Sequence, residues 1–294
     1  MLIYPKGSTV PLRGDLLVRA VLRTDMTPVP ATIELILKKS KEVDAAIVKG
    51  ETIKVVADHS IEFELVKVWE DEPTGKVQGD RPDIQVHAIG LLASCSAIAE
   101  PMGRSLVREG ATLGEIYRAC GASTRIESDF PVAVFSCFRG MAPSFEVAKA
   151  LMEEGGGLVY NKGKVAFKRL SDLKRAAADF KLSDAEVQRI GSEFLEKSAV
   201  PFAVSTDASG AIVTGRAQDG RGFVYRPRAD QRTVNNMGTV LIQRGKSDGA
   251  LAMGKNAGDR VDVGTKAMVV ITAAHIFEPS GEQATRFWLG EVVS

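Results

Sequence analysis

The stretch Glu153–Leu173 reads EEGGGLVYNKGKVAFKRLSDL and contains three consecutive glycines followed by a Gly-Lys pair. A phosphate-binding Walker loop requires four residues between its glycines, then Lys and Ser or Thr, with a helix after them. Here five residues separate Gly157 from Gly163, and Val165 follows the lysine. The residues after Lys164 alternate as a strand does. The stretch is therefore not a nucleotide site, and its glycines need another explanation.

A helix that ends at these glycines, followed by a β-hairpin, explains the stretch. Apolar residues that share one helical face predict a helix from about Ser144 to Glu154. Gly155–Gly157 then end it, because glycine adopts the left-handed backbone that a helix exit requires. The segments Leu158–Tyr160 and Val165–Arg169 flank a tight turn over Asn161–Lys164 and predict a hairpin.

Alternating apolar and polar residues upstream predict a β domain. In Ile61–Trp69, apolar residues alternate with Glu62 and Glu64. The segments of this character are Asp15–Thr24, Ala31–Leu37, Thr52–Ala57, Ile61–Trp69 and Asp83–Leu92. A set of short strands with polar turns between them is typical of a small barrel or sandwich.

Helical and β patterns alternate further along the chain. The pattern Thr112–Glu115 is a capping box that begins a helix, and Gly121 is expected to end it. A second capping box, Ser183–Glu186, predicts that Lys174–Ala199 is a helical connector. The strands predicted after this connector are Phe202–Ser205, Ile212–Gly215, Gly222–Tyr225, Thr239–Gln243, Arg260–Val263, Met268–Ala273 and Arg286–Val293.

The expected fold class is α+β and mostly β, with two β domains, each a barrel or a sandwich, that flank a small α/β insert. The expected boundaries are 1–100 for the first β domain, 101–173 for the insert, 174–199 for the helical connector and 200–294 for the second β domain. The two β regions have similar lengths and strand counts. We therefore predict one topology for both, although their sequences are unlike.

The composition is that of an ordinary globular protein. The chain has 294 residues, of which 45% are hydrophobic and 26% charged, and its formal net charge is +1. A balance this close to neutral provides no general attraction to nucleic acid or to an anionic membrane. No apolar run approaches the roughly 18 residues of a membrane span, and the N-terminus lacks a signal-peptide pattern. We therefore expect no membrane insertion, and folding in a cytoplasm.

No catalytic or metal-binding motif is recognisable, so we expect no enzyme, no cofactor and no catalytic, cofactor-binding or metal-binding residues. The cysteines and histidines are Cys95, Cys120, Cys137, His59, His87 and His275. Their wide spacing fits no metal motif. The cysteines are expected in the core, and His87 and His275 on the surface of a strand or in the core. The carboxylate pairs Asp71–Glu72 and Glu153–Glu154 lie at element ends, where solvated charge is usual. For Arg221–Arg228, which alternates Arg with aromatic residues, the polar face of a strand is preferred over a phosphate contact.

Roughly residues 60–173 resemble a known family. A capped helix (TLGEIYRACG), a β segment (DFPVAVFSCFRGMAPS) and a helix with a glycine exit and hairpin (EVAKALMEEGGGLVYNKGKVAFKRL) are similar to the insert of phage baseplate hub proteins. These form the late control D group, related to the N-terminal part of VgrG. The acidic-glycine exit Glu153–Gly156 and the basic return strand Lys164–Arg169 match that family. The segment DIQVHAIGLL resembles the end of its first barrel.

The resemblance implies two tail-tube-like β-barrel domains in one chain and a structural role without catalysis. It implies a homotrimer that joins the tail tube to the central spike. The other implied partners are a separate tail spike protein, the tail tube or a tube-initiator protein, baseplate wedge proteins and the tape measure protein, with DNA only in passage. The implied location is the baseplate of the virion, after assembly in the host cytoplasm.

Other functions remain open at this point. A tail-tube or tube-initiator protein would form a hexamer and need only one barrel. An envelope-acting hydrolase or carbohydrate-binding module would require a site assembled from residues scattered along the sequence.

Overall fold

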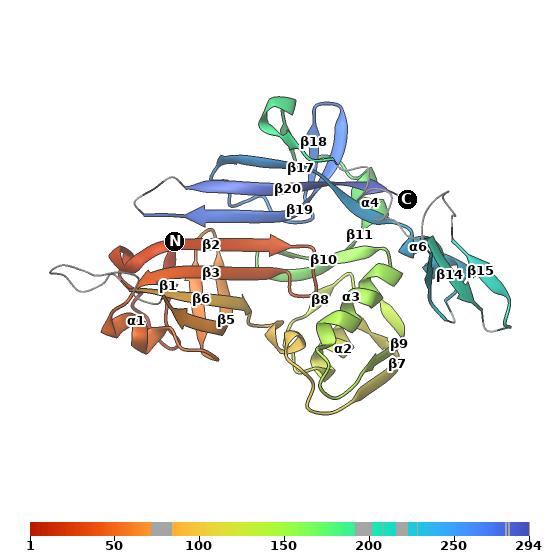
Figure 1. Ribbon diagram of the computed structural model, residues 1–294, viewed down its shortest axis with the longest axis horizontal. Coiled ribbons are helices and arrows are strands. Elements are labelled where there is room, and N and C mark those ends of the chain that lie inside the picture. The colour runs from red at the N-terminus through yellow and green to blue at the C-terminus, as the bar shows by residue number, and fades with distance from the viewer. Residues whose placement is uncertain are drawn as a thin grey trace.

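The molecule is elongated and mostly β (Figure 1). The computed structural model describes residues 1–71, 84–191, 202–207, 209–215, 223–227, 229–279, 281 and 283–293. Its largest element is a twelve-stranded sheet that runs through both predicted β domains. The predicted α+β, mostly β class is confirmed. Among the described residues, no helix combines the length and apolar character needed to cross a membrane.

The first half of this sheet is built from the first hundred residues. Its strands are β1 (Leu2–Tyr4), β2 (Leu17–Asp25), β3 (Ala31–Lys38), β4 (Thr52–Val56), β5 (Ser60–Glu70) and β6 (Gln85–Leu92). Alternation places one face in the core, so that Ile33 and Leu35 of β3 are buried while Glu34 is exposed. A 3-10 turn, η1 (Gly14–Leu16), precedes β2, and α1 (Lys41–Ala46) joins β3 to β4.

The second half repeats this arrangement. Its strands are β12 (Phe180–Leu182), β13 (Gln188–Arg189), β17 (Val240–Ala250), β18 (Arg260–Val263), β19 (Lys266–Phe277) and β20 (Ala284–Val293). The order across the sheet is β1-β4-β5-β6-β3-β2 in the first half and β12-β18-β19-β20-β17-β13 in the second. When the strands are numbered within each half, both orders read 1-4-5-6-3-2. The predicted common topology is confirmed for the strand order.

Finer features recur in both halves. The fifth strand of each half bulges against the sixth, between Leu65 and Lys67 in β5 and between Val270 and Thr272 in β19. A 3-10 turn precedes the second strand in each half, the later one being η3 (Asp184–Glu186). The halves differ in that β12 runs parallel to β18, whereas β1 is antiparallel to β4. Because bulges are specific features of a sheet, we interpret the halves as two versions of one architecture.

The halves join through β2 and β19. An antiparallel ladder runs from Thr272 opposite Asp25 to Phe277 opposite Ala20, while the rest of the same β19 edge pairs with β18. The expectation of closed barrels is therefore corrected, because the twelve described strands of the two halves form one open sheet. The edge of β2 that would close the first half on itself pairs with β19 instead.

The insert follows η2 (Ser96–Ala99) and contains both predicted helices and the predicted hairpin. Its elements are β7 (Leu106–Thr112), α2 (Leu113–Ala119), β8 (Ile126–Glu127), β9 (Pro131–Cys137), α3 (Pro143–Glu153), β10 (Gly156–Asn161), β11 (Lys164–Arg169) and α4 (Leu170–Arg175). The capping box of Thr112 and Glu115 begins α2 as predicted. The hairpin turns at Lys162 and Gly163, both with the positive φ that a tight hairpin turn requires.

The glycines after α3 are required by the conformation and the close packing of the backbone. Gly155 has a φ of +63° and donates its N–H to the carbonyl of Met152. A Cβ added to Gly156 would collide with the carbonyl of Lys168 and the ring of Phe167. The glycine exit is therefore explained by helix termination and close packing.

The predicted helical connector over 174–199 is wrong for its described part. Helix α4 ends at Arg175, and β12, η3 and β13 follow. The capping box of Ser183 and Glu186 exists, but it caps a single 3-10 turn. The reason is tertiary, because β12 and β13 add to the edges of β18 and β17. Residues 192–199 lie outside the described residues.

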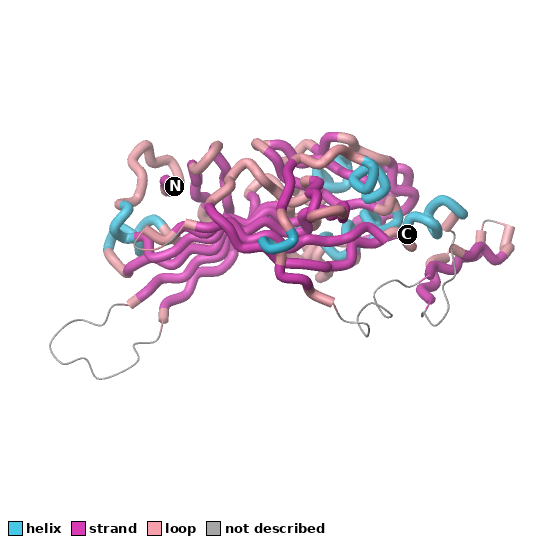
Figure 2. The backbone as a smooth tube through the Cα atoms, turned by 90° about the horizontal axis from the view of Figure 1, so that it is seen from above, coloured by secondary structure: helices cyan, strands magenta, loops and turns pink. Residues whose placement is uncertain are grey.

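The strands predicted between 202 and 225 do not join the second half of the sheet. They form a separate unit, the tip module, at one end of the molecule (Figure 1; Figure 2). Its elements are β14 (Phe202–Thr206), β15 (Ile212–Thr214), β16 (Phe223–Tyr225) and α6 (Gln231–Met237). The module lies in the connection between the second and third strands of the second half, where the first half has only a short turn.

The cysteines and His275 occupy the core, as predicted. All three cysteines are buried, and burial raises the pKa of the Cys95 and Cys120 thiols to about 11. His275 lies opposite Leu22 in the ladder that joins the halves and is buried, with Nδ1 3.0 Å from Oγ1 of Thr285. Its Nε2 has no hydrogen-bond partner among the described residues. Burial lowers the pKa of His275 to about 4.

We expect Gly156→Ala to lower the free energy of unfolding by about 1–3 kcal/mol, because the new methyl group overpacks the contact with β11. Urea denaturation measures this change. The control is Gly254→Ala, since Gly254 has open space around its Cα and an ordinary φ. Equal stabilities of the two variants would contradict the packing argument.

His275 should make the fold sensitive to acid. The pKa is 6.5 in the unfolded chain and about 4 in the folded one, so the neutral form is favoured by folding. Stability present above pH 6.5 is therefore lost as the pH falls toward 4. Between pH 7 and pH 5 this group alone costs about 2 kcal/mol. Urea denaturation at both pH values should show a smaller loss for His275→Gln than for the wild type, and equal losses would refute the assignment.

Candidate functional site

Two adjacent carboxylates at the end of α3 hold the tip module against the insert. Glu154 lies between two arginines from different elements, with Oε2 2.7 Å from Nη2 of Arg169 and Oε1 2.6 Å from Nη2 of Arg232. Glu153 Oε1 lies 2.5 Å from Nη2 of Arg226. We call these five residues the ionic clasp. It ties β11, α6 and the end of β16 to one helix terminus.

Burial and ion pairing shift the pKa values of the two clasp carboxyl groups in opposite directions. The Glu154 side chain is only 8% exposed. Burial raises the pKa of Glu154, but Arg232 and Arg169 outweigh it and hold the pKa below its usual value. For Glu153, burial raises the pKa and Arg226 offsets it only in part. A buried carboxylate without its arginines would be costly, so the arginines of the tip module complete this site.

The docking contact also includes a hydrogen bond and a close approach of the backbone. Asn236 donates from Nδ2 to the backbone carbonyl of Glu153 at 3.2 Å. Gly155 leaves room for the same neighbour, because a Cβ there would lie 3.2 Å from the Asn236 carbonyl oxygen. The buried apolar residues of the tip module form a cluster of their own, around Val234 and Met237. The module is therefore a small unit with its own core, held by charges at the acidic-glycine exit.

The sequence interpretation of Glu153–Glu154 as solvated charge is wrong. Both side chains are largely buried and paired. The available signal was their position at the C-terminal end of a helix, where the macrodipole disfavours negative charge. Two carboxylates at such a place indicate that cations lie close by. In the other carboxylate pair, Asp71 lies 2.9 Å from His87 Nε2; Glu72 lies outside the described residues.

The outer face of the tip module is apolar. Helix α6 packs on one face of the small sheet, against Ala203 and Val213. On the opposite face, Ile212 is 76%, Phe223 66% and Tyr225 53% exposed. A sheet normally buries one face against a second layer, and a cluster of exposed apolar side chains marks a contact surface.

The stretch Arg221–Arg228 therefore differs from the expected polar strand face. Phe223 and Tyr225 belong to the apolar outer face, and Arg226 belongs to the ionic clasp. Arg221 and Arg228 lie outside the described residues.

The solvent face of the large sheet carries paired charges. Arg19 lies 3.2 Å from Glu278, Arg23 3.3 Å from Asp25, and Lys246 3.2 Å from Asp248. A shallow hollow at the junction of the halves is lined in part by Arg19, Arg23, Glu34, Arg286 and Trp288. The cations named here have carboxylate neighbours, so this face offers little net attraction to a polyanion.

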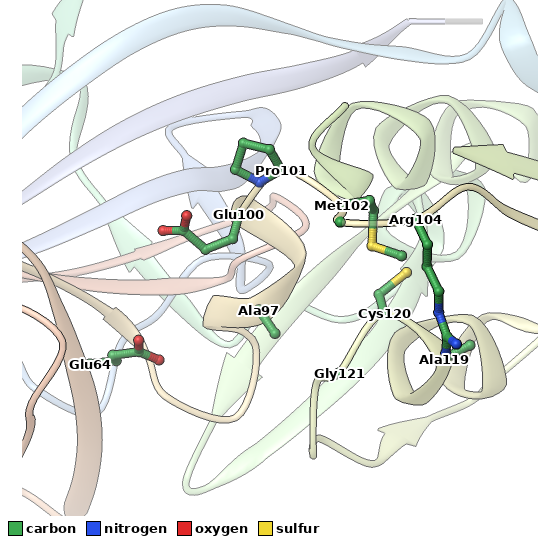
Figure 3. Close-up of a pocket in the computed structure, with 10 residues that line it drawn as sticks. Glu64, Ala97, Glu100, Pro101, Met102, Arg104, Ala119, Cys120 and Gly121 are labelled. Carbon is green, nitrogen blue, oxygen red and sulfur yellow. The ribbon is translucent and has the colours of Figure 1, made fainter. Parts of the chain in front are cut away.

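An open hollow of about 680 Å³ lies between β5 and the insert (Figure 3). Glu64 and Glu100 lie on one side of it, and Met102, Arg104 and Cys120 on the other. Glu64 accepts a hydrogen bond from the Ser96 hydroxyl, and burial raises the pKa of the Cys120 thiol to about 11. This arrangement does not activate a nucleophile. Among the described residues, no group of three His, Cys, Asp or Glu side chains is placed to hold a metal ion.

Comparison with known proteins extends this description. No family model matches the chain, and no curated protein matches it by sequence. Solved structures do match over nearly the whole length. A tail protein from Neisseria meningitidis MC58 matches with a TM-score of 0.66 at 10% identity, covering 99% of this chain and 95% of that one. The 43 kDa tail protein of prophage MuSo2 from Shewanella oneidensis matches with a TM-score of 0.62 at 13% identity, covering 99% and 95%.

This chain has the fold of phage tail proteins. A type VI secretion component of E. coli, described as similar to the T4 tail proteins gp27 and gp5, also matches, with a TM-score of 0.55 at 7% identity, covering 100% of this chain and 77% of that one. The resemblance to baseplate hub proteins and to the N-terminal part of VgrG is thereby confirmed at the level of fold.

Glu154→Gln should loosen the tip module. The change removes the charge that both arginines bind, so opening of the module should become easier by roughly 1–3 kcal/mol. Hydrogen exchange should then accelerate in α6 and β14 and stay unchanged in β3 and β6. Glu127→Gln is the control, because Glu127 forms an exposed ion pair with Lys164 elsewhere in the insert. Unchanged exchange in α6 would contradict the role of the clasp.

Proposed function

We propose that this chain is the structural hub of a phage tail baseplate. It forms a trimeric ring that joins the tail tube to the central spike and lets DNA pass, without catalytic turnover. The observation that supports this function best is the duplicated strand order, 1-4-5-6-3-2, in one continuous sheet. The similarity to tail proteins over 99% of the chain supports the same function.

The duplication explains why three copies suit this role. Each chain supplies two tube-like units, so a ring of three chains presents six similar units toward a six-fold tube. The same ring presents three identical chains toward a three-fold spike. The two units are β1–β6 and the set β12, β13 and β17–β20, with the insert between them and the tip module added to the second unit.

The surfaces suit the proposed partners. The charge-paired face of the sheet suits a wall past which DNA moves without binding tightly. The apolar outer face of the tip module suits a protein contact at the periphery, where wedge proteins would meet the hub. The spike, the tail tube or tube initiator and the tape measure protein would meet the two ends of the ring. In this proposal the protein acts in the virion baseplate after assembly in the host cytoplasm.

The duplicated sheet favours a hub over a tail-tube protein. A tube or tube-initiator protein forms a hexamer from one unit per chain, whereas this chain carries two units in a single sheet. No arrangement in the described residues favours an envelope-acting hydrolase.

Deletion of the gene from its phage should leave no completed tails, because tube growth would lack its platform. Electron microscopy of lysates measures this, and expression of the chain from a plasmid should restore the tails. Normal-length tails with intact baseplates in its absence would refute the hub function.

Light scattering on the purified chain, alone and with its spike, should give the mass of a trimer. The mass of a hexamer would favour a tube protein.

A further inference from the structure

The junction between the two halves has a counterpart that is left open in the described part of the single chain. Within the chain, the second strand of the first half, β2, pairs with the fifth strand of the second half, β19. The reciprocal partners are the second strand of the second half, β13, and the fifth strand of the first half, β5. Among the described strands, the sheet ends at β13, and β4 covers one edge of β5 only from Ser60 to Glu64.

We propose that β13 of one copy pairs with the free part of β5, Lys67–Glu70, in a second copy of this chain. The sheet would then continue from copy to copy as it continues from half to half, with antiparallel strands at each junction. The proposal rests on the proposed ring and names the residues at which its chains meet. It also gives a partner to two edges that would otherwise invite unspecific strand pairing.

The internal repeat predicts the register of this junction. The bulges make Lys67 of β5 equivalent to Thr272 of β19, so Trp69 is equivalent to Ala274 and Glu70 to His275. The residues of β13 are matched to those of β2 in the same way, through the strands that they pair with. In the first half, β2 pairs with β3 and β3 with β6; in the second half, β13 pairs with β17 and β17 with β20.

This second comparison makes Arg189 equivalent to Leu22 and Ile190 equivalent to Arg23. Within the chain, Arg23 lies opposite Ala274 and Leu22 lies opposite His275. Between copies, the equivalent positions place Ile190 opposite Trp69 and Arg189 opposite Glu70.

The side chains at these positions match, although only backbone pairings were used to derive the register. Trp69 is 38% and Ile190 39% exposed in the single chain, and each would cover the other. Arg189 and Glu70 carry opposite charges. Cross-strand pairs of an aromatic with a β-branched residue, and of opposite charges, both stabilise antiparallel sheets.

Trp69 is already held in place for such a contact. Its ring stacks on His87 with 5.0 Å between centroids, and the Lys67 ammonium lies 4.8 Å from the ring centroid. An ordered side chain loses less conformational entropy when it is covered than a mobile one. The charged residues are also oriented, since Glu70 pairs with Lys39 and Arg189 with Asp184.

The decisive experiment is cysteine cross-linking of the full chain. The double variant Trp69→Cys and Ile190→Cys is oxidised with diamide and run on a non-reducing gel. Opposite positions in antiparallel strands bring Cβ atoms within disulfide range, and the three native cysteines are buried. The control double variant is Val48→Cys and Ile190→Cys, because Val48 is 43% exposed but lies outside the strands.

We expect covalent dimers and a closed covalent trimer from the first variant and neither from the control. If the wild type is a trimer by light scattering but the double-cysteine variant forms no cross-link, the proposed junction is wrong and the proposed ring remains supported. Cross-linked ladders longer than three chains would support the junction and refute the closed trimer. A wild type that stays monomeric, with no cross-link at high concentration, would overturn both.

A second measurement does not depend on disulfide geometry. Ile190→Asp places a charge opposite Trp69 and should weaken assembly by about tenfold or more, measured as the dissociation constant by sedimentation. Val48→Asp is the matched control and should leave assembly unchanged. Equal dissociation constants for Ile190→Asp and the wild type would overturn the proposed contact.

Discussion

The backbone ladder between β2 and β19 is the contact on which the rest of the structure depends. It joins two similar sets of strands, gives the edge of β2 a partner and so leaves the first half open instead of closed into a barrel. His275, in this ladder opposite Leu22, is buried there. A sheet edge buried without a partner would leave unpaired amides and carbonyls, so the ladder is obligatory once the halves meet. The open form of the sheet follows from it, and so do the two edges, at β13 and at the end of β5, that have no partner among the described strands.

The sequence predicted the strands of the sheet better than the short helices and connections between them. Burial of one face imposes a period of two, and this pattern located β3 and β18 almost to the residue. Helices α1 and α6 were missed because each is short and buries only one or two side chains, which leaves too weak a periodic signal. The capping box at Ser183 predicted a long helix wrongly, since a local signal cannot reveal that neighbouring residues will add to distant strand edges.

The ionic clasp could not be predicted for a related reason. Arg232 meets Glu154 across 78 residues of sequence, and no periodicity connects them. What the sequence did contain was a pair of carboxylates where a helix dipole disfavours them. Such a local conflict indicates that a missing partner must come from elsewhere in the fold. The resemblance to hub proteins pointed to the same acidic-glycine exit, and the structure supplies a physical reason for it, the docking of the tip module.

The two halves keep one sheet architecture but differ in what is added to it. The first half connects its second and third strands by a short turn, whereas the second half places the tip module in that connection. The insert likewise follows only the first half. In the proposed ring, six similar sheets would therefore form an even inner wall, while the added modules would occur three times around the outside. The duplicated sheet suits contact with a six-fold tube. The modules that are added to only one half of each chain suit contact with a three-fold spike, so one chain can match both symmetries.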